Sequence, residues 1–199
     1  MMKVNILIVG VGGQGVLTTS GILARAAMEE GLNVVSAETH GMAQRGGSVE
    51  VHLRIGDVRS PLIPYGHADF IASLEPVEIL RYGHYMGDNT VAVVNTRPIS
   101  PPSVSTGVAK YPELEEIADR IRPHLGELYT VNASEIAERL AGTIQATNVV
   151  MAGILIGLGI PLKLNSVEKA LGEVLPEKMV EANIKALREG FQLGEKLRK

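Results

Sequence analysis

The sequence contains no cysteine among its 199 residues. Cysteine thiolates are the usual ligands of iron–sulfur clusters and of many zinc sites, and they also form disulfides and act as nucleophiles. A chain without them holds no iron–sulfur cluster, no zinc–thiolate site and no disulfide. If electron transfer depends on this protein, we therefore expect the electron carriers to lie on another chain.

Positive charge is not in excess either, because 19 Lys and Arg residues stand against 22 Asp and Glu residues and give a formal net charge of -3. Nucleic acids and anionic membranes attract proteins through clustered basic side chains. The charge balance therefore predicts neither nucleic acid nor membrane as a partner.

The sequence has no long uninterrupted apolar run. Residues 149–162 come nearest, but they include three glycines and Pro161 and fall short of the roughly 20 residues that cross a bilayer. They predict a buried helix. Residues 1–10 lead straight into an apolar strand pattern, without the small-residue cleavage site of a signal peptide. We therefore expect a cytoplasmic protein.

Hydrophobic residues make up 45% of the chain and charged residues 21%, which is typical of a folded protein. The length allows one substantial core. We expect a single domain over residues 1–199, with an α/β core in about residues 1–140 and a helical part in about residues 143–199.

Alternating strand and helix patterns predict the fold class. Residues 4–9 are continuously apolar, as in a central strand of a parallel sheet that helices cover on both faces. Residues 16–30 have helical spacing and precede Gly31, and residues 33–37 are the next apolar run, so we expect a βαβ unit with a right-handed crossover. In residues 49–55 polar and apolar side chains alternate, which indicates an edge or antiparallel strand with one solvated face.

Later elements continue the pattern. Strands are predicted at residues 70–73, 90–94 and 128–131, and helices at residues 76–80, 112–122, 133–140, 145–158, 166–174 and 176–196. Asn132 and Asn165 are the expected N-caps of two of these helices, and residues 97–105 are expected to form a Pro-rich loop. The order predicts a three-layer, Rossmann-like α/β domain with a mostly parallel sheet.

A glycine-rich turn between the first strand and the first helix is the sharpest local motif. It matches G-x-G-x-x-G and reads Gly10-Val11-Gly12-Gly13-Gln14-Gly15. Such glycines let a phosphate or carboxylate approach backbone N–H groups at the positive end of a helix. Glu38, after the second strand, has the position of a ribose-binding acid. Dinucleotide binding, anion binding and simple helix-to-strand packing all stay open, and anion binding or close backbone approach is the interpretation we favour.

The loop after the second strand is a second candidate site, because it lies where open α/β sheets bind ligands. It reads Glu38-Thr39-His40-Gly41-Met42-Ala43-Gln44-Arg45-Gly46-Gly47. Arg45, beside two glycines, offers a guanidinium fork for a carboxylate, a phosphate or a partner's backbone. His40 has the chemistry to move a proton near neutral pH, although a lone histidine is more often structural.

The remaining polar residues give weaker signals. His52 falls on the polar face of the strand predicted at residues 49–55, which predicts a solvated side chain. Glu75 and Asn95 follow two strands and would lie at the same end of the sheet, where structural roles are favoured for both. No histidine pair has metal-site spacing, so no metal is predicted, and no G-x-S-x-G motif supports a hydrolase.

Read together, the two motifs resemble the gamma units of the 2-oxoacid ferredoxin oxidoreductase family, and within it the small (beta) subunits of indolepyruvate ferredoxin oxidoreductases. The similarity runs through almost the whole chain. It includes Arg45-Gly46-Gly47-Ser48, Ser60-Pro61, Ala68-Asp69, Glu75-Pro76 and residues 148–157. The string from Glu38 to Gly47 is its specific part.

The resemblance implies that the enzyme converts aryl 2-oxoacids to acyl-CoA by oxidative decarboxylation and reduces ferredoxin. It also implies that a larger, cysteine-rich alpha subunit binds thiamine diphosphate, magnesium and the iron–sulfur clusters, while coenzyme A is the co-substrate. This chain would then be inactive alone. The glycine turn and residues 38–47 would face the partner near its active site, where Arg45 orients coenzyme A or substrate or fixes the interface.

Several alternatives stay open at this point. A gamma subunit for pyruvate, 2-oxoglutarate or a branched-chain 2-oxoacid would share the same motifs. A free-standing dinucleotide-binding protein and a non-catalytic interaction module also fit the residues. A homodimer of the isolated chain is a further alternative.

Overall fold

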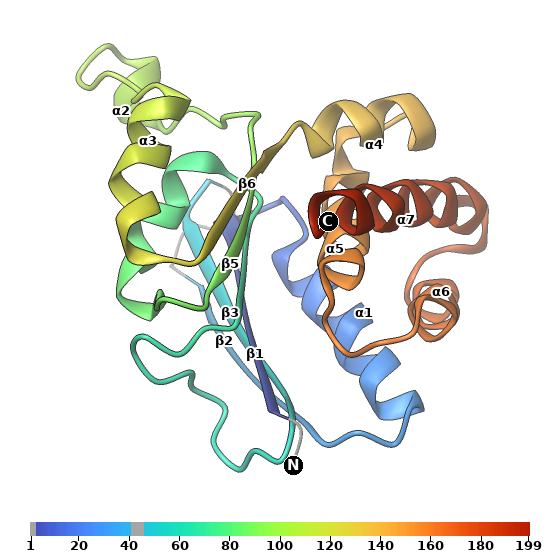
Figure 1. The fold of residues 1–199 in the computed structure, drawn as a ribbon. Helices are drawn as coiled ribbons and strands as arrows, with labels where there is room; N and C mark the ends of the chain where they lie inside the picture. The colour runs from blue at the N-terminus through green and yellow to red at the C-terminus, as the bar shows by residue number, and fades with distance from the viewer. Residues whose placement is uncertain (1–2, 41–45) are drawn as a thin grey trace.

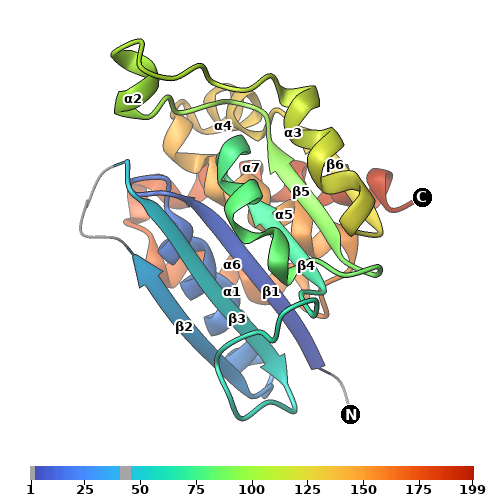
Figure 2. The same cartoon turned by 90° about the vertical axis from the view of Figure 1, so that its left-hand side faces the viewer.

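Six strands form one mixed sheet in the computed structural model, which describes residues 3–40 and 46–199. The strand order is β2-β3-β1-β4-β5-β6 (Figures 1 and 2). The strands are β1 (Lys3–Val11), β2 (Val34–His40), β3 (Ser48–Gly56), β4 (Phe70–Ser73), β5 (Val91–Asn95) and β6 (Glu127–Val131). Strands β1, β4, β5 and β6 are parallel, whereas β3 runs antiparallel to its two neighbours, β1 and β2.

Helices cover both faces of the sheet. They are α1 (Val16–Glu29), η1 (Pro76–Tyr85, a 3-10 helix), α2 (Pro102–Ser105), α3 (Leu114–Ile121), η2 (Arg122–His124), α4 (Ala133–Ala141), η3 (Ile144–Ala146), α5 (Thr147–Leu158), α6 (Leu164–Val174) and α7 (Glu177–Leu197). Figure 1 shows α1 and α4 to α7 on one face and α2 and α3 on the other. The predicted three-layer α/β class is confirmed.

Strand β1 supplies both hydrophobic cores, as expected of a strand that is apolar on both sides. Ile6 and Ile8 pack into the larger core on the side of α1 and α5. Leu7 and Val9 point the other way, into a smaller core with residues such as Ile79 of η1. Because successive side chains of a strand alternate between faces, this strand must lie inside the sheet, with helices on both sides.

The first two strands are not neighbours in the sheet. Strand β2 runs parallel to β1, but β3 lies between them, so that Val51 of β3 pairs with Ile8 on one side and with Glu38 on the other. The βαβ connection through α1 therefore skips one position in the sheet. In Figure 2, β2 forms the left-hand edge of the sheet.

Strand β3 is antiparallel as expected, but it is neither an edge strand nor solvated on its polar face. His52 and Arg54 are buried, with exposed fractions of 1% and 7%. Residues 57–69 fold back over this face: the amide of Ile63 donates to His52 Nδ1 (3.2 Å), and Arg54 donates to the carbonyl oxygens of Ser60 and Leu62. Protein hydrogen bonds thus replace the water that the alternating pattern predicted.

Helix α5 is buried along its whole length, in agreement with the helix predicted at residues 145–158. Helices α1 and α7 both pack against α5. No helix within residues 3–40 and 46–199 is long and apolar enough to span a membrane.

Helix ends were predicted with mixed success. Asn132 caps α4 as expected, since its side chain accepts from the amide of Glu135 (3.2 Å). Asn165 is not a cap, because α6 begins one residue earlier, at Leu164, and Lys163 takes the N-cap position without a side-chain bond. The expected Pro-rich loop also contains the short helix α2.

Candidate functional site

The glycine turn joins β1 to α1 in a conformation that needs glycine. Gly13 and Gly15 have positive φ angles of 100° and 82°, which other residues seldom adopt. Gly15 is the N-cap of α1, no side chain caps that end, and the first turn contains no acidic residue. The positive end of α1 is therefore left without a negative side chain of its own helix to neutralise it.

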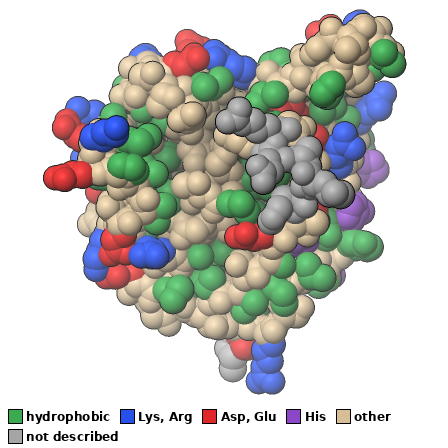
Figure 3. All heavy atoms as spheres, turned by 180° about the vertical axis from the view of Figure 1, so that it is seen from behind, with side chains coloured by type: hydrophobic (Ala, Val, Ile, Leu, Met, Phe, Trp, Pro, Cys, Tyr) green, Lys and Arg blue, Asp and Glu red, His purple; other side chains and the backbone are tan. Residues whose placement is uncertain are grey.

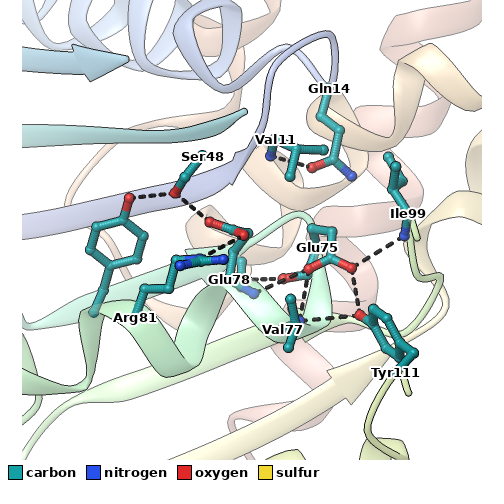
Figure 4. Close-up of polar contacts among 11 residues, drawn as sticks. Val11, Gln14, Ser48, Glu75, Val77, Glu78, Arg81, Ile99 and Tyr111 are labelled. Carbon is teal, nitrogen blue, oxygen red and sulfur yellow. Dashed lines mark hydrogen bonds and ion pairs between the residues drawn. The ribbon is translucent and has the colours of Figure 1, made fainter. Parts of the chain in front are cut away.

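Gln14 holds this turn closed with its side chain (Figure 4). Its Oε1 accepts from the amide of Val11 (2.9 Å), and its Nε2 donates to the carbonyl oxygen of Leu74 after β4 (2.8 Å). A Cβ atom on Gly10 would lie only 2.7 Å from Gln14 Oε1. Gly10 and Gln14 thus have structural roles within the turn.

The two motifs singled out in the sequence meet through backbone hydrogen bonds. The amide of Gly12 donates to the carbonyl oxygen of Gly47 (2.8 Å), and the amide of Gly46 donates to the carbonyl oxygen of Gly12 (3.2 Å). Next in the chain, Ser48 is bonded to Glu78 and to the phenol of Tyr82. The end of the loop at residues 38–47 is therefore fixed against the glycine turn.

A cavity of about 480 Å³ opens beside this junction, at the carboxyl end of the sheet. Its walls come from the glycine turn, the segment after β5, the start of α4 and the segment around η3. The lining residues are Gly12, Gly13, Gln14, Gly46, Arg97, Ile99, Ser134, Ile144, Gln145 and Thr147. A smaller cavity of about 210 Å³ adjoins it and is lined by Gly15, Thr18 and Asn148, among others.

The polar groups of the larger cavity suit binding better than catalysis. Arg97 is the one charged residue among the described residues that line it, and its guanidinium pairs with Glu138 at 2.6 Å. The hydroxyls of Ser134 and Thr147 lie 3.1 Å apart, and Ser134 also bonds to Asn95. Within the part of the chain that the structure describes, none of the lining residues is a carboxylate, histidine or lysine that could serve as a general acid or base.

Glu75 and Asn95 have structural partners, in line with the role favoured from sequence. Glu75 is fully buried and accepts hydrogen bonds from the amides of Val77 and Ile99 and from the phenol of Tyr111 (Figure 4). Burial and the bond to Glu75 hold the pKa of Tyr111 above its ordinary value, so the phenol stays protonated and donates. Asn95 donates to the carbonyl oxygen of Leu74 (3.0 Å).

Three other predicted site residues lie elsewhere or outside the described residues. Glu38 is exposed on the edge strand β2, with β3 between it and the glycine turn. His40 ends β2, but its side chain is not described, and Arg45 lies outside the described residues. Roles for His40 and Arg45 stay predictions.

Arg97, Ser134, Gln145 and Thr147 were missed as cavity residues. Arg97 follows β5 by two residues and Ser134 follows β6 by three, so the rule that ligands bind at the carboxyl ends of strands could have found both. Gln145 and Thr147 carry no such signal, because their segment reaches the site only through the packing of α4 and α5. Within the described residues, no three His, Asp or Glu side chains come together as metal ligands.

Comparison with known proteins places the chain in a family. The profile of the pyruvate ferredoxin/flavodoxin oxidoreductase family matches residues 5–193. The indolepyruvate oxidoreductase subunit IorB of Archaeoglobus fulgidus is 59% identical over 191 residues, which cover 96% of this chain and 94% of that protein.

Two solved structures have a similar fold. One is the gamma subunit of a keto/oxoacid ferredoxin oxidoreductase from Geobacter sulfurreducens, with a TM-score of 0.73, 23% identity and coverage of 97% of this chain and 99% of that chain. The other is the 2-oxoglutarate:ferredoxin oxidoreductase of Magnetococcus marinus with 2-oxoglutarate, coenzyme A and succinyl-CoA bound (TM-score 0.75, 18% identity, 99% of this chain and 32% of that chain). With a family match over nearly its whole length, the chain belongs to the pyruvate ferredoxin/flavodoxin oxidoreductase family.

Proposed function

We propose that this chain is the small subunit of an indolepyruvate ferredoxin oxidoreductase, which converts aryl 2-oxoacids to acyl-CoA and reduces ferredoxin. The cavity beside the glycine turn is the observation that carries the proposal, since its described lining consists of backbone amides, one arginine and neutral side chains, without an acid or base. Such a site binds and orients a substrate whose chemistry takes place on another chain. The 59% identity to a protein named as an indolepyruvate oxidoreductase subunit supports the choice of substrate.

The larger partner is proposed to hold the redox cofactors because this chain does not fit them. Iron–sulfur clusters need thiolates, and the sequence has none. Magnesium bound with thiamine diphosphate needs oxygen ligands, and no cluster of three such side chains lies within the described part of the chain. Thiamine diphosphate on a larger, cysteine-rich alpha subunit would supply the decarboxylating chemistry, and the small subunit alone would be inactive.

Coenzyme A is a group of the reaction whose chemistry the described cavity residues fit. Its phosphates and amides need hydrogen-bond donors and a cation rather than thiolates or clustered carboxylates. Arg97, the backbone of Gly13 and the amide of Gln145 supply such groups along one cavity. We propose that these residues hold part of coenzyme A, and that Gly46 and Gly47 bring the loop with Arg45 and His40 to the same place.

The other features of the proposal follow from this role. Residues 1–199 would work as one gamma-type domain, because the helical C-terminal part packs against the same sheet as α1. A reaction that consumes coenzyme A and reduces ferredoxin fits the cytoplasm.

The test is reconstitution with the larger subunit. The assembled enzyme is expected to reduce ferredoxin or a viologen dye with indolepyruvate and coenzyme A, at a higher kcat/KM than with pyruvate or 2-oxoglutarate. Turnover by the small subunit alone would contradict the proposal. So would an assembled enzyme that prefers pyruvate over indolepyruvate and phenylpyruvate.

A further inference from the structure

An uncharged arm projects from the body of the protein between β5 and α3. It consists of residues 98–109, and the lysine at position 110 is the first charged residue after Arg97. Figure 1 shows it, with α2, at the upper left, and Figure 3 shows it from behind as a protrusion that carries hydrophobic side chains. Since charged residues make up 21% of the whole chain, a segment of this length without any falls below the average composition of the chain.

The arm is ordered by its own hydrogen bonds. The amide of Thr106 donates to the carbonyl oxygen of Pro102 (2.9 Å), and the amide of Ala109 closes the tip by donating to the carbonyl oxygen of Ser103 (2.9 Å). Pro98 and Pro101 further restrict the backbone. A segment already fixed in one conformation loses little entropy when it binds a partner.

One buried carboxylate anchors both ends of the arm. Glu75 Oε1 accepts from the amide of Ile99, at the start of the arm, at 3.2 Å and from the phenol of Tyr111, just after its end, at 2.5 Å (Figure 4). Burying a carboxylate has a cost that its hydrogen bonds must offset. Here those bonds hold the two ends of a projecting segment in place.

The tip of the arm presents an apolar side chain to solvent. Val108 is 83% exposed, the largest exposed fraction of any large hydrophobic side chain within residues 3–40 and 46–199. Ile99, at the base, is 39% exposed and lines the larger cavity. The arm therefore connects the mouth of the cavity with an apolar tip, without a charge in between.

We infer that the arm at residues 98–109 is a preformed docking element for the larger subunit, and that Val108 inserts into an apolar depression of that subunit. The inference rests on the proposed function and deepens it. The position of the arm indicates which partner it contacts. Arg97 and Ile99, at the base of the arm, both line the cavity, so a chain that covers the mouth of the cavity also contacts the arm. The neutral surface of the arm calls for a neutral, apolar surface on the partner, since an uncompensated charge buried there would be costly.

The absence of cysteine allows a direct test. The Val108→Cys variant carries a single thiol at the tip of the arm, and Met28→Cys is the control, since Met28 is 67% exposed near the far end of α1. Each variant is labelled with a maleimide as the isolated subunit and in the assembled complex, and the modified peptide is measured by mass spectrometry. Assembly is expected to slow labelling at position 108 at least tenfold and at position 28 less than twofold.

A second pair of variants tests the energetics. Val108→Glu is expected to raise the Kd for the larger subunit at least tenfold, whereas Met28→Glu should leave it within twofold. Both sites are exposed in the subunit, so neither change should affect its folding, which thermal unfolding checks. Equal Kd values for the two variants would overturn the inference.

The outcomes separate this inference from the proposed function. If the wild-type complex oxidises indolepyruvate but position 108 labels at the same rate in the free subunit and in the complex, the arm does not dock and only this inference fails. If position 108 is already protected in an isolated subunit that sediments as a dimer, a second copy of the chain is the occupant and the inference is overturned. If no larger subunit yields an active complex, the proposed function and the inference fail together.

Discussion

Gly153 of α5 lies directly against the backbone of Leu187 in α7, and a Cβ atom added to Gly153 would overlap the carbonyl oxygen of Leu187. The same holds for three other pairs along the crossing of these helices: Gly157 with Phe191, Gly190 with Val150, and Gly194 with Ile154. The two helices therefore touch backbone to backbone. The close contact explains why α5, which is apolar on all sides, can be fully covered.

We expect Gly153→Ala to lower the free energy of unfolding by about 2 kcal/mol or more, because the added methyl group must push α7 away. Gly21→Ala is the matched control, since Gly21 is also helical but has no atom within 4 Å of the position of the new Cβ. That change should be neutral or stabilise by up to about 1 kcal/mol. Urea denaturation measures both, and equal effects would contradict the close contact.

Arg54 is expected to be essential for the fold of residues 57–69. Its buried guanidinium donates to Asn5 Oδ1 (2.9 Å) and to the carbonyl oxygens of Ser60 and Leu62. Arg54→Met should cost about 2–4 kcal/mol of unfolding free energy, because these oxygens lose their donor inside the protein. Limited proteolysis should also cut residues 57–69 faster. Arg59→Met, at an exposed site in the same segment, should do neither.

His52 gives stability a dependence on pH. Burial, with smaller effects from Arg54 and His84, lowers the pKa of His52 below its ordinary value of about 6.5. As pH falls below 6.5 the unfolded chain therefore binds a proton that the folded chain does not, and His52 removes stability at a slope of at most about 1.4 kcal/mol per pH unit.

Unfolding of the wild type and of His52→Gln between pH 7 and pH 5 isolates this effect. The variant should be less stable at pH 7, because His52 Nδ1 accepts from Ile63, but its stability should fall less steeply with pH. The neighbouring Glu50 has a raised pKa, mainly through burial, and its stabilising contribution is lost as pH rises from about 4.5, which is the opposite direction. His124→Gln, at an exposed site, is the control for the replacement of a histidine.

Arg45→Ala is expected to lower kcat/KM of the reconstituted complex at least tenfold, which corresponds to about 1.4 kcal/mol of transition-state stabilisation. The subunit should keep its unfolding free energy, so that the loss reflects a missing contact rather than misfolding. Arg59→Ala serves as a control for the removal of one exposed arginine. Unchanged steady-state kinetics would remove Arg45 from the site.

Local patterns were sufficient to predict most elements of the fold. The strand predicted at residues 70–73 has those bounds in the structure, and α4 begins after its expected cap, Asn132. Both depend on signals within a few neighbouring residues. The α/β class also follows from the order of such signals, since strands that alternate with helices pack as layers.

Strand order and the burial of polar side chains could not be predicted in the same way. The position of β3 depends on its pairing with both β1 and β2, and the burial of His52 depends on residues 57–69, which bond to that strand from outside it. An alternating pattern predicts only that one face of the strand is polar. It does not indicate whether water or protein groups form the hydrogen bonds of that face. In the candidate site, the sequence places the two motifs at the same end of the sheet, and the hydrogen bond between Gly12 and Gly46 agrees with that prediction. Gln145 could not be predicted there, because it reaches the site only through tertiary packing.

The strand inserted between β1 and β2 also limits how the glycine turn can be re-engineered to bind a nicotinamide cofactor. In a nicotinamide-binding fold the acid that selects the ribose sits on the strand next to the turn, but here two sheet spacings, about 10 Å, separate the two strands. Substituting Glu38 would therefore not convert this scaffold into a dehydrogenase. Such a conversion would require deletion of β3 and reclosure of the sheet.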